Sequence, residues 1–361
     1  MATRQLARMG LPPELAVRLA ARNLVTARDL FARTLLDLVE LLDLPYDTVK
    51  AILGDVARRI VPQPQSALDL LRAAAAQPLH LRTSLPPLDE ALFGGLPAGS
   101  VTEVVGPAGL GKTQLCLQLS VLACLERQAE GGSVVYLDTE KKFSSRRMAQ
   151  IARERFPDSF PSEEAVAALM GRVLVYNPTS SQGLLSTLQS LEPAIIDHRV
   201  RLLVLDSAAS LARADFAPGS LPDRQRMLGQ QASRLKYLAE AFRIPVLVTN
   251  QVTTHLGDGG GSNGGGAGHL TAALGTMWAH AVNTRLVLES AAGNRFVRIA
   301  KSPAAPNAAF AYRVTGAGLE LLPDVVPPPQ LLQPGSVVHG AIANEVPYEL
   351  EGAAAVAFNL M

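Results

Sequence analysis

Gly106-Pro107-Ala108-Gly109-Leu110-Gly111-Lys112-Thr113 is the stretch that decides the fold. It fits the G-x-x-x-x-G-K-[ST] pattern of a phosphate-binding loop, with a β-rich run at 101–105 before it and helical periodicity over 114–123 after it. The glycines let backbone N–H groups close around phosphate oxygens, and the following helix points its positive end at them. We therefore expect the loop and the adjoining Gln114 to bind a nucleotide, with Lys112 on the phosphates and Thr113 on Mg²⁺.

Length and composition limit the classes of protein to consider. With 361 residues, of which 48% are hydrophobic, the chain can form one large domain and a smaller one. We see no secretory signal and no apolar run near the roughly 18–20 residues of a membrane span, so no membrane partner is expected. The net charge of +1 neither supports nor excludes nucleic-acid binding. Cys116 and Cys124 are expected to be buried small hydrophobes in a reducing compartment.

The chain divides into four regions. Residues 1–62 predict a small helical N-terminal domain, for which a packing or protein-contact role is favoured over DNA binding. Residues 63–85 indicate a linker, and the proline-containing tail at 323–361 is expected to be loose or ordered only on a partner. Residues 86–322 alternate strands and helices, which is typical of an α/β core with a mostly parallel sheet. Strands are expected at 101–105, 133–138, 173–176, 201–206, 244–249, 284–288 and 295–300.

Three of these strands end in polar residues suited to an ATP site. The run 202–205 delivers Asp206, a candidate Mg²⁺ ligand, at a strand's carboxyl end. The run 134–137 leads to Glu140, a candidate general base for water, the alternative being a surface acid that caps the next helix. The run 246–249 leads to Gln251, whose amide can sense a γ-phosphate by hydrogen bonding.

A glycine-rich segment follows Gln251. Eight of the twelve residues in 257–268 are glycine, so we expect a mobile loop without packed structure. A flexible insertion is the plainer interpretation. Its position after the candidate sensor favours a DNA loop that responds to the nucleotide.

Taken together, these motifs resemble a known family. The phosphate loop and the segments 137–140, 205–207 and 249–251, in this order, are similar to the RecA-type recombinases of eukaryotes and archaea. Residues 92–96 and 280–285 match as well, and the resemblance covers 86–322. The segments 235–240, 249–256, 278–285 and 300–303 look most like the B-type paralogue branch. The resemblance implies a RecA-like P-loop ATPase core with a small all-α N-terminal domain.

The same resemblance implies roles for single residues. Lys112 and Thr113 would bind phosphate and metal, Asp206 would support Mg²⁺, Glu140 would activate water, and Gln251 would report the γ-phosphate. Four further positions match family positions near the nucleotide: Arg147 on the adenine, His280 as a relay to a neighbouring subunit's nucleotide, Pro303 in the segment that covers that nucleotide, and Lys301 in place of an acid beside this proline. Lys301 would neutralise γ-phosphate charge across an interface or be exposed.

Two departures from the family pattern concern assembly and DNA. The aromatic of the family's aromatic-x-x-Ala hook is missing from 64–67, and such an anchor contributes roughly 2–4 kcal/mol to an interface, so a long homopolymer is disfavoured. The segment 252–284 contains no Lys or Arg and should bind DNA weakly by itself. Arg213, Arg224 and Arg226 are better candidate phosphate contacts, with a solvated helix face as the alternative.

The sequence therefore favours an ATP-binding, Mg²⁺-dependent and slow DNA-dependent ATPase of the nucleus. It would join other recombinase paralogues in a hetero-oligomer and assist the main recombinase on single-stranded or branched DNA. An autonomous strand-exchange recombinase, and a non-hydrolysing subunit that uses ATP only to hold an interface, remain as alternatives.

Overall fold

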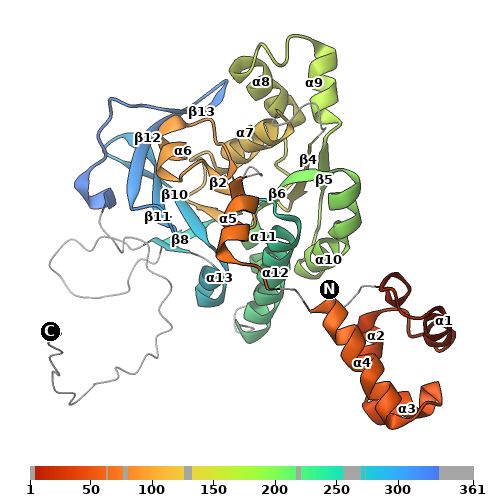
Figure 1. Cartoon of the computed structure of the whole chain (residues 1–361). Coiled ribbons are helices and arrows are strands. Elements are labelled where there is room, and N and C mark those ends of the chain that lie inside the picture. Colours follow the sequence, from red (N-terminus) through yellow and green to blue (C-terminus); the bar gives the residue numbers. More distant parts are fainter. Residues whose placement is uncertain are drawn as a thin grey trace, which may run out of the picture. The chain divides into compact units, whose positions relative to one another are not determined.

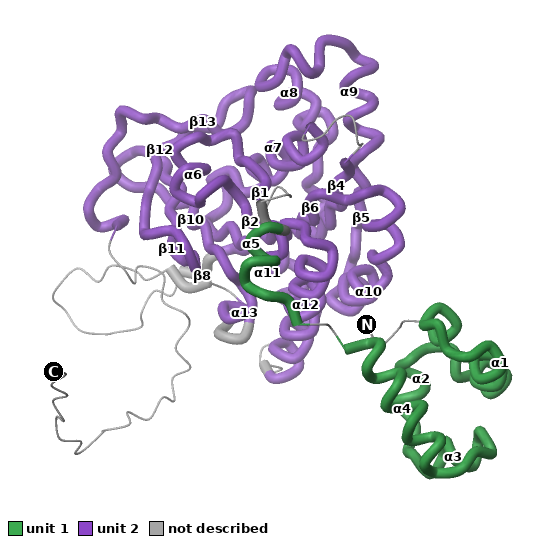
Figure 2. The backbone as a smooth tube through the Cα atoms, in the orientation of Figure 1, with its two compact units in different colours: residues 1–77 green, residues 78–361 purple. Residues whose placement is uncertain are grey.

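The computed structural model describes residues 5–61, 64–75, 80–125, 132–216, 221–254, 270–272 and 274–332. The chain forms two compact units, Met1–Gln77 and Pro78–Met361, coloured separately in Figure 2. In the described residues no helix combines the length and the apolar character that crossing a membrane requires.

The first unit is a small helical domain. Two of its helices begin at capping boxes: the Thr26 and Thr34 hydroxyls accept from the N–H groups of Asp29 and Asp37, whose carboxylates accept from the threonine N–H groups. Apolar faces from the successive helices meet in a leucine-rich core that includes the fully buried Leu30. Its elements are η1 (Leu6–Arg8), α1 (Pro13–Ala21), α2 (Ala27–Phe31), α3 (Leu35–Leu42), α4 (Tyr46–Ile60) and α5 (Ala67–Ala75).

The second unit is an α/β domain built on a nine-stranded sheet of order β13-β12-β11-β10-β3-β7-β6-β4-β5 (Figure 1). The strands from β10 to β5 are parallel, and β11, β12 and β13 extend the sheet in antiparallel fashion. The strands are β1 (His80–Leu81), β2 (Leu96–Pro97), β3 (Val101–Val105), β4 (Ser133–Asp138), β5 (Val173–Tyr176), β6 (Val200–Asp206), β7 (Val246–Asn250), β8 (Val252–Thr254), β9 (Leu270–Ala272), β10 (Thr284–Ala291), β11 (Asn294–Lys301), β12 (Ala308–Thr315) and β13 (Gly318–Leu321). The helices are α6 (Pro86–Ala91), α7 (Lys112–Leu125), α8 (Ser145–Arg155), α9 (Glu163–Met170), α10 (Ser181–Asp197), α11 (Ala208–Ala214), α12 (Leu221–Phe242), α13 (Gly275–Ala281) and η3 (Pro329–Leu332).

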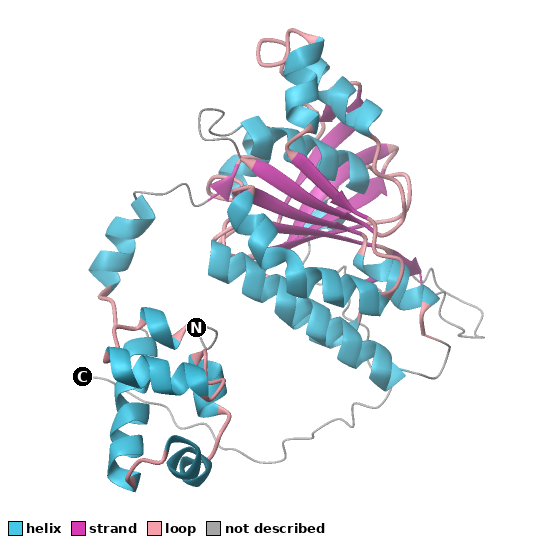
Figure 3. Ribbon diagram, turned by 90° about the vertical axis from the view of Figure 1, so that its right-hand side faces the viewer, coloured by secondary structure: helices cyan, strands magenta, loops and turns pink. Residues whose placement is uncertain are grey.

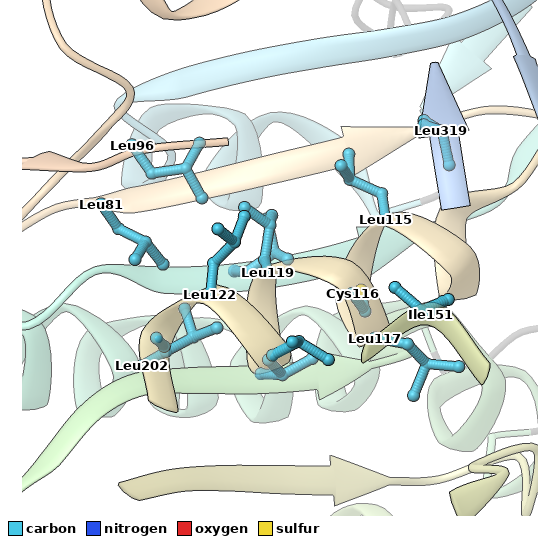
Figure 4. Close-up of a cluster of buried hydrophobic side chains, with 14 of the residues drawn as sticks. Leu81, Leu96, Leu115, Cys116, Leu117, Leu119, Leu122, Ile151, Leu202 and Leu319 are labelled. Carbon is cyan, nitrogen blue, oxygen red and sulfur yellow. The ribbon is translucent and has the colours of Figure 1, made fainter. Parts of the chain in front are cut away.

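Helices cover both faces of this sheet, as Figure 3 shows. Successive strand residues point to opposite faces, so on β4 the side chains of Val134 and Tyr136 pack in one core and those of Val135 and Leu137 in the other. The first core lies under α7, α8 and α9, and Figure 4 shows Leu115 and Leu119 of α7 within it. The second lies under α10, α11, α12 and α13. Burial on both faces explains why the parallel strands read as continuous apolar runs.

The expected α/β class, its mostly parallel sheet and the small all-α N-terminal region are confirmed. The expected strands are present, but β12 and β13 were not predicted. The expected linker, 63–85, needs correction because it holds α5 and β1, and Leu81 and Leu85 are buried in the core of the second unit. Both cysteines are buried and free, as expected. The glycine-rich segment 257–268 and the tail beyond residue 332 lie outside the described residues.

Candidate nucleotide-binding site

The phosphate-binding loop connects β3 to α7 at the carboxyl edge of the sheet. Gly109 and Gly111 have φ angles of 80° and 101°, a region that side chains disfavour, so the pattern's glycines are needed here. The Lys112 ammonium donates to the carbonyls of Gly106 and Pro107, at 2.6 and 2.9 Å. Burial lowers the pKa of Lys112. The negative charges of Asp206 and Glu140 act in the opposite direction but do not cancel the effect of burial. The lysine thus already points into the loop, where phosphate oxygens can replace the carbonyls.

Asp206 lies at the end of β6 and accepts three hydroxyl hydrogen bonds. Its Oδ2 accepts from Thr113 at 2.8 Å and from Tyr136 at 2.9 Å, and its Oδ1 accepts from Thr249 at 2.5 Å. A threonine hydroxyl beside a carboxylate is a hard oxygen pair that fits Mg²⁺ bound jointly with phosphates and water. The described residues contain no group of three His, Cys, Asp or Glu that would bind a metal on their own.

Glu140, two residues beyond β4, faces the same site. Its Oε1 accepts from the Ser207 hydroxyl at 2.6 Å and from the Gln251 amide at 2.9 Å, and Lys142 pairs with Oε2. Burial alone would raise the pKa of Glu140, but these hydrogen bonds and the Lys142 charge hold it below the usual value. The carboxylate is therefore ionised at neutral pH, as a group that orients or deprotonates water must be.

Gln251 links this carboxylate to one of the candidate DNA contacts. Its amide oxygen accepts from Arg213 Nη1 at 2.9 Å, while its amide nitrogen donates to Glu140. Arg213 is exposed near the end of α11, the short helix that starts directly after Asp206 and Ser207.

The side chains of Lys112, Thr113, Glu140, Asp206 and Gln251 line one cavity of about 310 Å³. The cavity is lined by Ala108, Gly109, Gly111, Lys112, Thr113, Gln114, Glu140, Lys142, Asp206, Ser207, Gln251, Arg295 and Val314.

Arg295 of β11 was missed by the sequence reasoning. It lies opposite Tyr312 on β12, whose hydroxyl donates to the carbonyl of Leu110 in the phosphate loop, at 2.5 Å. The alternation of Phe310, Tyr312 and Val314 with smaller or polar residues was the signal that could have found β12. Nothing in the sequence indicated that the antiparallel extension brings Arg295 into the lining of this cavity.

Arg147, the expected adenine contact, lies at the side of the same region. Its guanidinium donates to Gln114 at 2.6 Å and to the carbonyls of Thr315 and Gly316, at 2.5 and 2.9 Å. These bonds connect Arg147, on α8, to α7 and to the β12–β13 turn. The planar Arg147 guanidinium thus lies next to Gln114, which lines the cavity.

Lys301, Pro303 and His280 do not line the cavity of this chain. The Lys301 ammonium donates to the carbonyls of Ala279 and Val282 at the end of α13, at 2.9 and 2.5 Å. Lys301 is half-buried rather than exposed, because within this chain it binds carbonyls at a helix end. Its expected role across a subunit interface stays a prediction. Pro303 and His280 are exposed.

The other two candidate DNA contacts are on α12, away from the cavity. Arg226 is exposed and pairs with Asp223 at 3.2 Å. Arg224 lies on the same helix, is partly buried and is not without an interaction partner.

Comparison with known proteins identifies the family of this chain. The Rad51 family matches residues 75–321, and an XRCC3/RpoA-like helix-hairpin-helix domain matches residues 6–60. The chain is 42% identical to the DNA repair protein RAD51 homolog 2 of Mus musculus over 89% of this chain and 98% of the relative. It is 40% identical to the Homo sapiens protein of that name, over 89% of this chain and 90% of the relative. For the Arabidopsis thaliana protein of that name the identity is 39%, over 90% of this chain and 92% of the relative. The resemblance drawn from the motifs is thereby confirmed, and this chain belongs to the Rad51 family.

Proposed function

We propose that this protein is an ATP-binding recombinase paralogue that acts in DNA repair by homologous recombination. The observation that carries the proposal is the single cavity in which Lys112, Thr113, Asp206, Glu140 and Gln251 converge. Similarity to relatives named as RAD51 homolog 2 over most of the chain supports it.

The residues divide the work of ATP hydrolysis between them. Bound Mg²⁺–ATP supplies the phosphoryl group and the metal charge that neutralises it. Lys112 would exchange its two carbonyl partners for phosphate oxygens, and Thr113 and Asp206 would hold the metal. Glu140 orients water and accepts its proton, and Gln251 reaches the γ-phosphate through its amide nitrogen. The remaining site assignments are proposed from the family resemblance: Arg147 on the adenine, and Lys301, Pro303 and His280 toward a neighbouring subunit's nucleotide.

We infer that the protein works in a hetero-oligomer with other recombinase paralogues. The absence of an aromatic in residues 64–67 removes the side chain that would anchor one copy to the next. In this assembly it would help the main recombinase to assemble or stay on single-stranded or branched DNA, in the nucleus.

Three measurements test the proposal. Purified protein should bind ATP in a Mg²⁺-dependent manner, and DNA-stimulated turnover should be lost in Lys112→Ala. Light scattering with ATP and single strands should show no long homofilaments. Unchanged turnover in Lys112→Ala would contradict the ATPase role, and long filaments would favour an autonomous recombinase.

A non-hydrolysing structural subunit is the second candidate. The bonds from Ser207, Gln251 and Lys142 to Glu140 favour it, because each makes the carboxylate a weaker base. For this candidate, the purified protein shows no ATP turnover and Glu140→Gln leaves ATP binding and assembly unchanged, whereas Lys112→Ala abolishes ATP binding and the assembly that depends on it.

A further inference from the structure

We propose that Arg213 is a positioning residue that couples DNA to the ATP site by exchanging its hydrogen bond to Gln251 for one to a DNA phosphate. This inference rests on the proposed function. It concerns a route through α11 rather than through the glycine-rich segment.

The starting point is an amide that is held at both ends. Gln251 accepts from Arg213 through its oxygen and donates to Glu140 through its nitrogen, both at 2.9 Å. An arginine only donates and a carboxylate only accepts, so the amide has one possible orientation. Turning the amide nitrogen toward a γ-phosphate also turns the amide oxygen, so the hydrogen bond from Arg213 is lost in the same rotation, even if one of the two N–H groups of the nitrogen keeps Glu140.

Arg213 is also placed to change partners. It is exposed, and its hydrogen bond to Gln251 ends on a neutral amide oxygen. A phosphate oxygen is charged and therefore forms a stronger hydrogen bond with a guanidinium. The segment 252–284 contains no Lys or Arg, so it cannot offer DNA the phosphate neutralisation that Arg213 can.

The two exchanges help each other. A γ-phosphate that draws Gln251 away leaves Arg213 ready for DNA, and DNA that draws Arg213 away leaves Gln251 ready for the γ-phosphate. Because such coupling is reciprocal, each ligand should tighten the binding of the other. A nucleotide without a γ-phosphate should not show the effect.

The test measures this coupling in the full-length protein. A fluorescently labelled oligothymidine is titrated in the presence of Mg²⁺ with either ATPγS or ADP, and the ratio of the two DNA dissociation constants gives the coupling. We expect wild-type DNA binding to be about fivefold tighter with ATPγS, at the low end of typical coupling between sites. In Arg213→Ala and in Gln251→Ala the ratio should fall to about one.

The two variants should differ in a second readout. Arg213→Ala should reduce the salt dependence of DNA binding by about one phosphate contact, whereas Gln251→Ala should leave it unchanged. The control is Arg153→Ala, which removes another partly exposed arginine, paired with Glu163 on the neighbouring helix. It should keep the wild-type ratio and salt dependence.

The outcomes separate the two proposals. If Arg213→Ala keeps the wild-type ratio, or if Arg153→Ala loses it equally, the inference is wrong while the proposed function stands. If the wild type binds both ligands without coupling, the inference is again wrong. If the wild type binds no DNA or no ATPγS, the proposed function fails and the inference fails with it.

Discussion

Thr113 and Asp206, which are 93 positions apart, are joined by a hydrogen bond of 2.8 Å from the threonine hydroxyl to the carboxylate. The bond connects the first turn of α7 to the end of β6, across the carboxyl edge of the parallel sheet. Ligands of such sheets bind at this edge, where the strand ends converge. The pair therefore sets the position of the proposed metal relative to the phosphate loop.

The first prediction concerns this pair. Asp206→Asn and Thr113→Val should each weaken the Mg²⁺-dependent part of the thermal stabilisation by ATP. The first replaces a charged carboxylate by a neutral amide, and the second removes the threonine hydroxyl. Differential scanning fluorimetry with ATP measures this stabilisation as the difference in Tm between samples with Mg²⁺ and samples with EDTA. Asp223→Asn, which alters an exposed carboxylate on α12, should retain the full Mg²⁺ effect. Retention of that effect in both site variants would exclude this metal position.

A second prediction concerns the arginine that the sequence did not reveal. Arg295→Ala should weaken ATP binding by about five- to tenfold, or roughly 1–1.4 kcal/mol, because a positive charge leaves the cavity that receives the phosphates. Titration with a fluorescent ATP analogue measures the dissociation constant. The control is Arg313→Ala on β12, an exposed arginine paired with Glu320, which should bind ATP like the wild type. Equal affinities in all three proteins would show that Arg295 does not contact the nucleotide.

The third prediction is a pH dependence. The pKa of Glu140 is lowered from 4.5 in the folded protein, so the ionised carboxylate is favoured by folding. Its contribution to stability is fully present above the unfolded pKa and is lost as the pH falls through the lower folded pKa. The difference in Tm between wild type and Glu140→Gln should therefore be constant at neutral pH and shrink below about pH 4.5. A difference that grows on acidification would contradict the sign of this shift.

The fourth prediction concerns a buried charge on β3, directly before the phosphate loop. Glu103 is fully buried and accepts from Asn250 at 2.8 Å, from Trp278 at 2.9 Å and from Arg285 at 2.6 Å. Glu103→Gln should lower the free energy of unfolding by about 3–5 kcal/mol, because it leaves the Arg285 charge buried without its partner. Urea denaturation followed by the fluorescence of Trp278, the one tryptophan of the chain, measures it.

The surface pair Glu320–Arg313 provides the comparison for this experiment. Glu320→Gln should cost no more than about 1 kcal/mol, because solvent screens an exposed pair. Similar losses in the two variants would argue against a structural role for the Glu103 network.

The parallel part of the fold was predictable from local patterns. The phosphate loop, the strand ending at Asp206 and the strand before Glu140 are each specified by a few consecutive residues. Because parallel strands place their carboxyl ends at one edge, the meeting of Lys112, Glu140, Asp206 and Gln251 could also be anticipated.

Only the tertiary structure placed Arg295 in the lining of the nucleotide cavity, tied Arg213 to Gln251 and turned Lys301 to the end of α13. Each of these three placements depends on how segments far apart in the chain align with one another. Local periodicity in the sequence does not encode that alignment. A sequence pattern specifies which element forms and which face is apolar. The partners of a polar side chain are decided when distant elements pack, because a shift of one residue along a strand exchanges the face it presents.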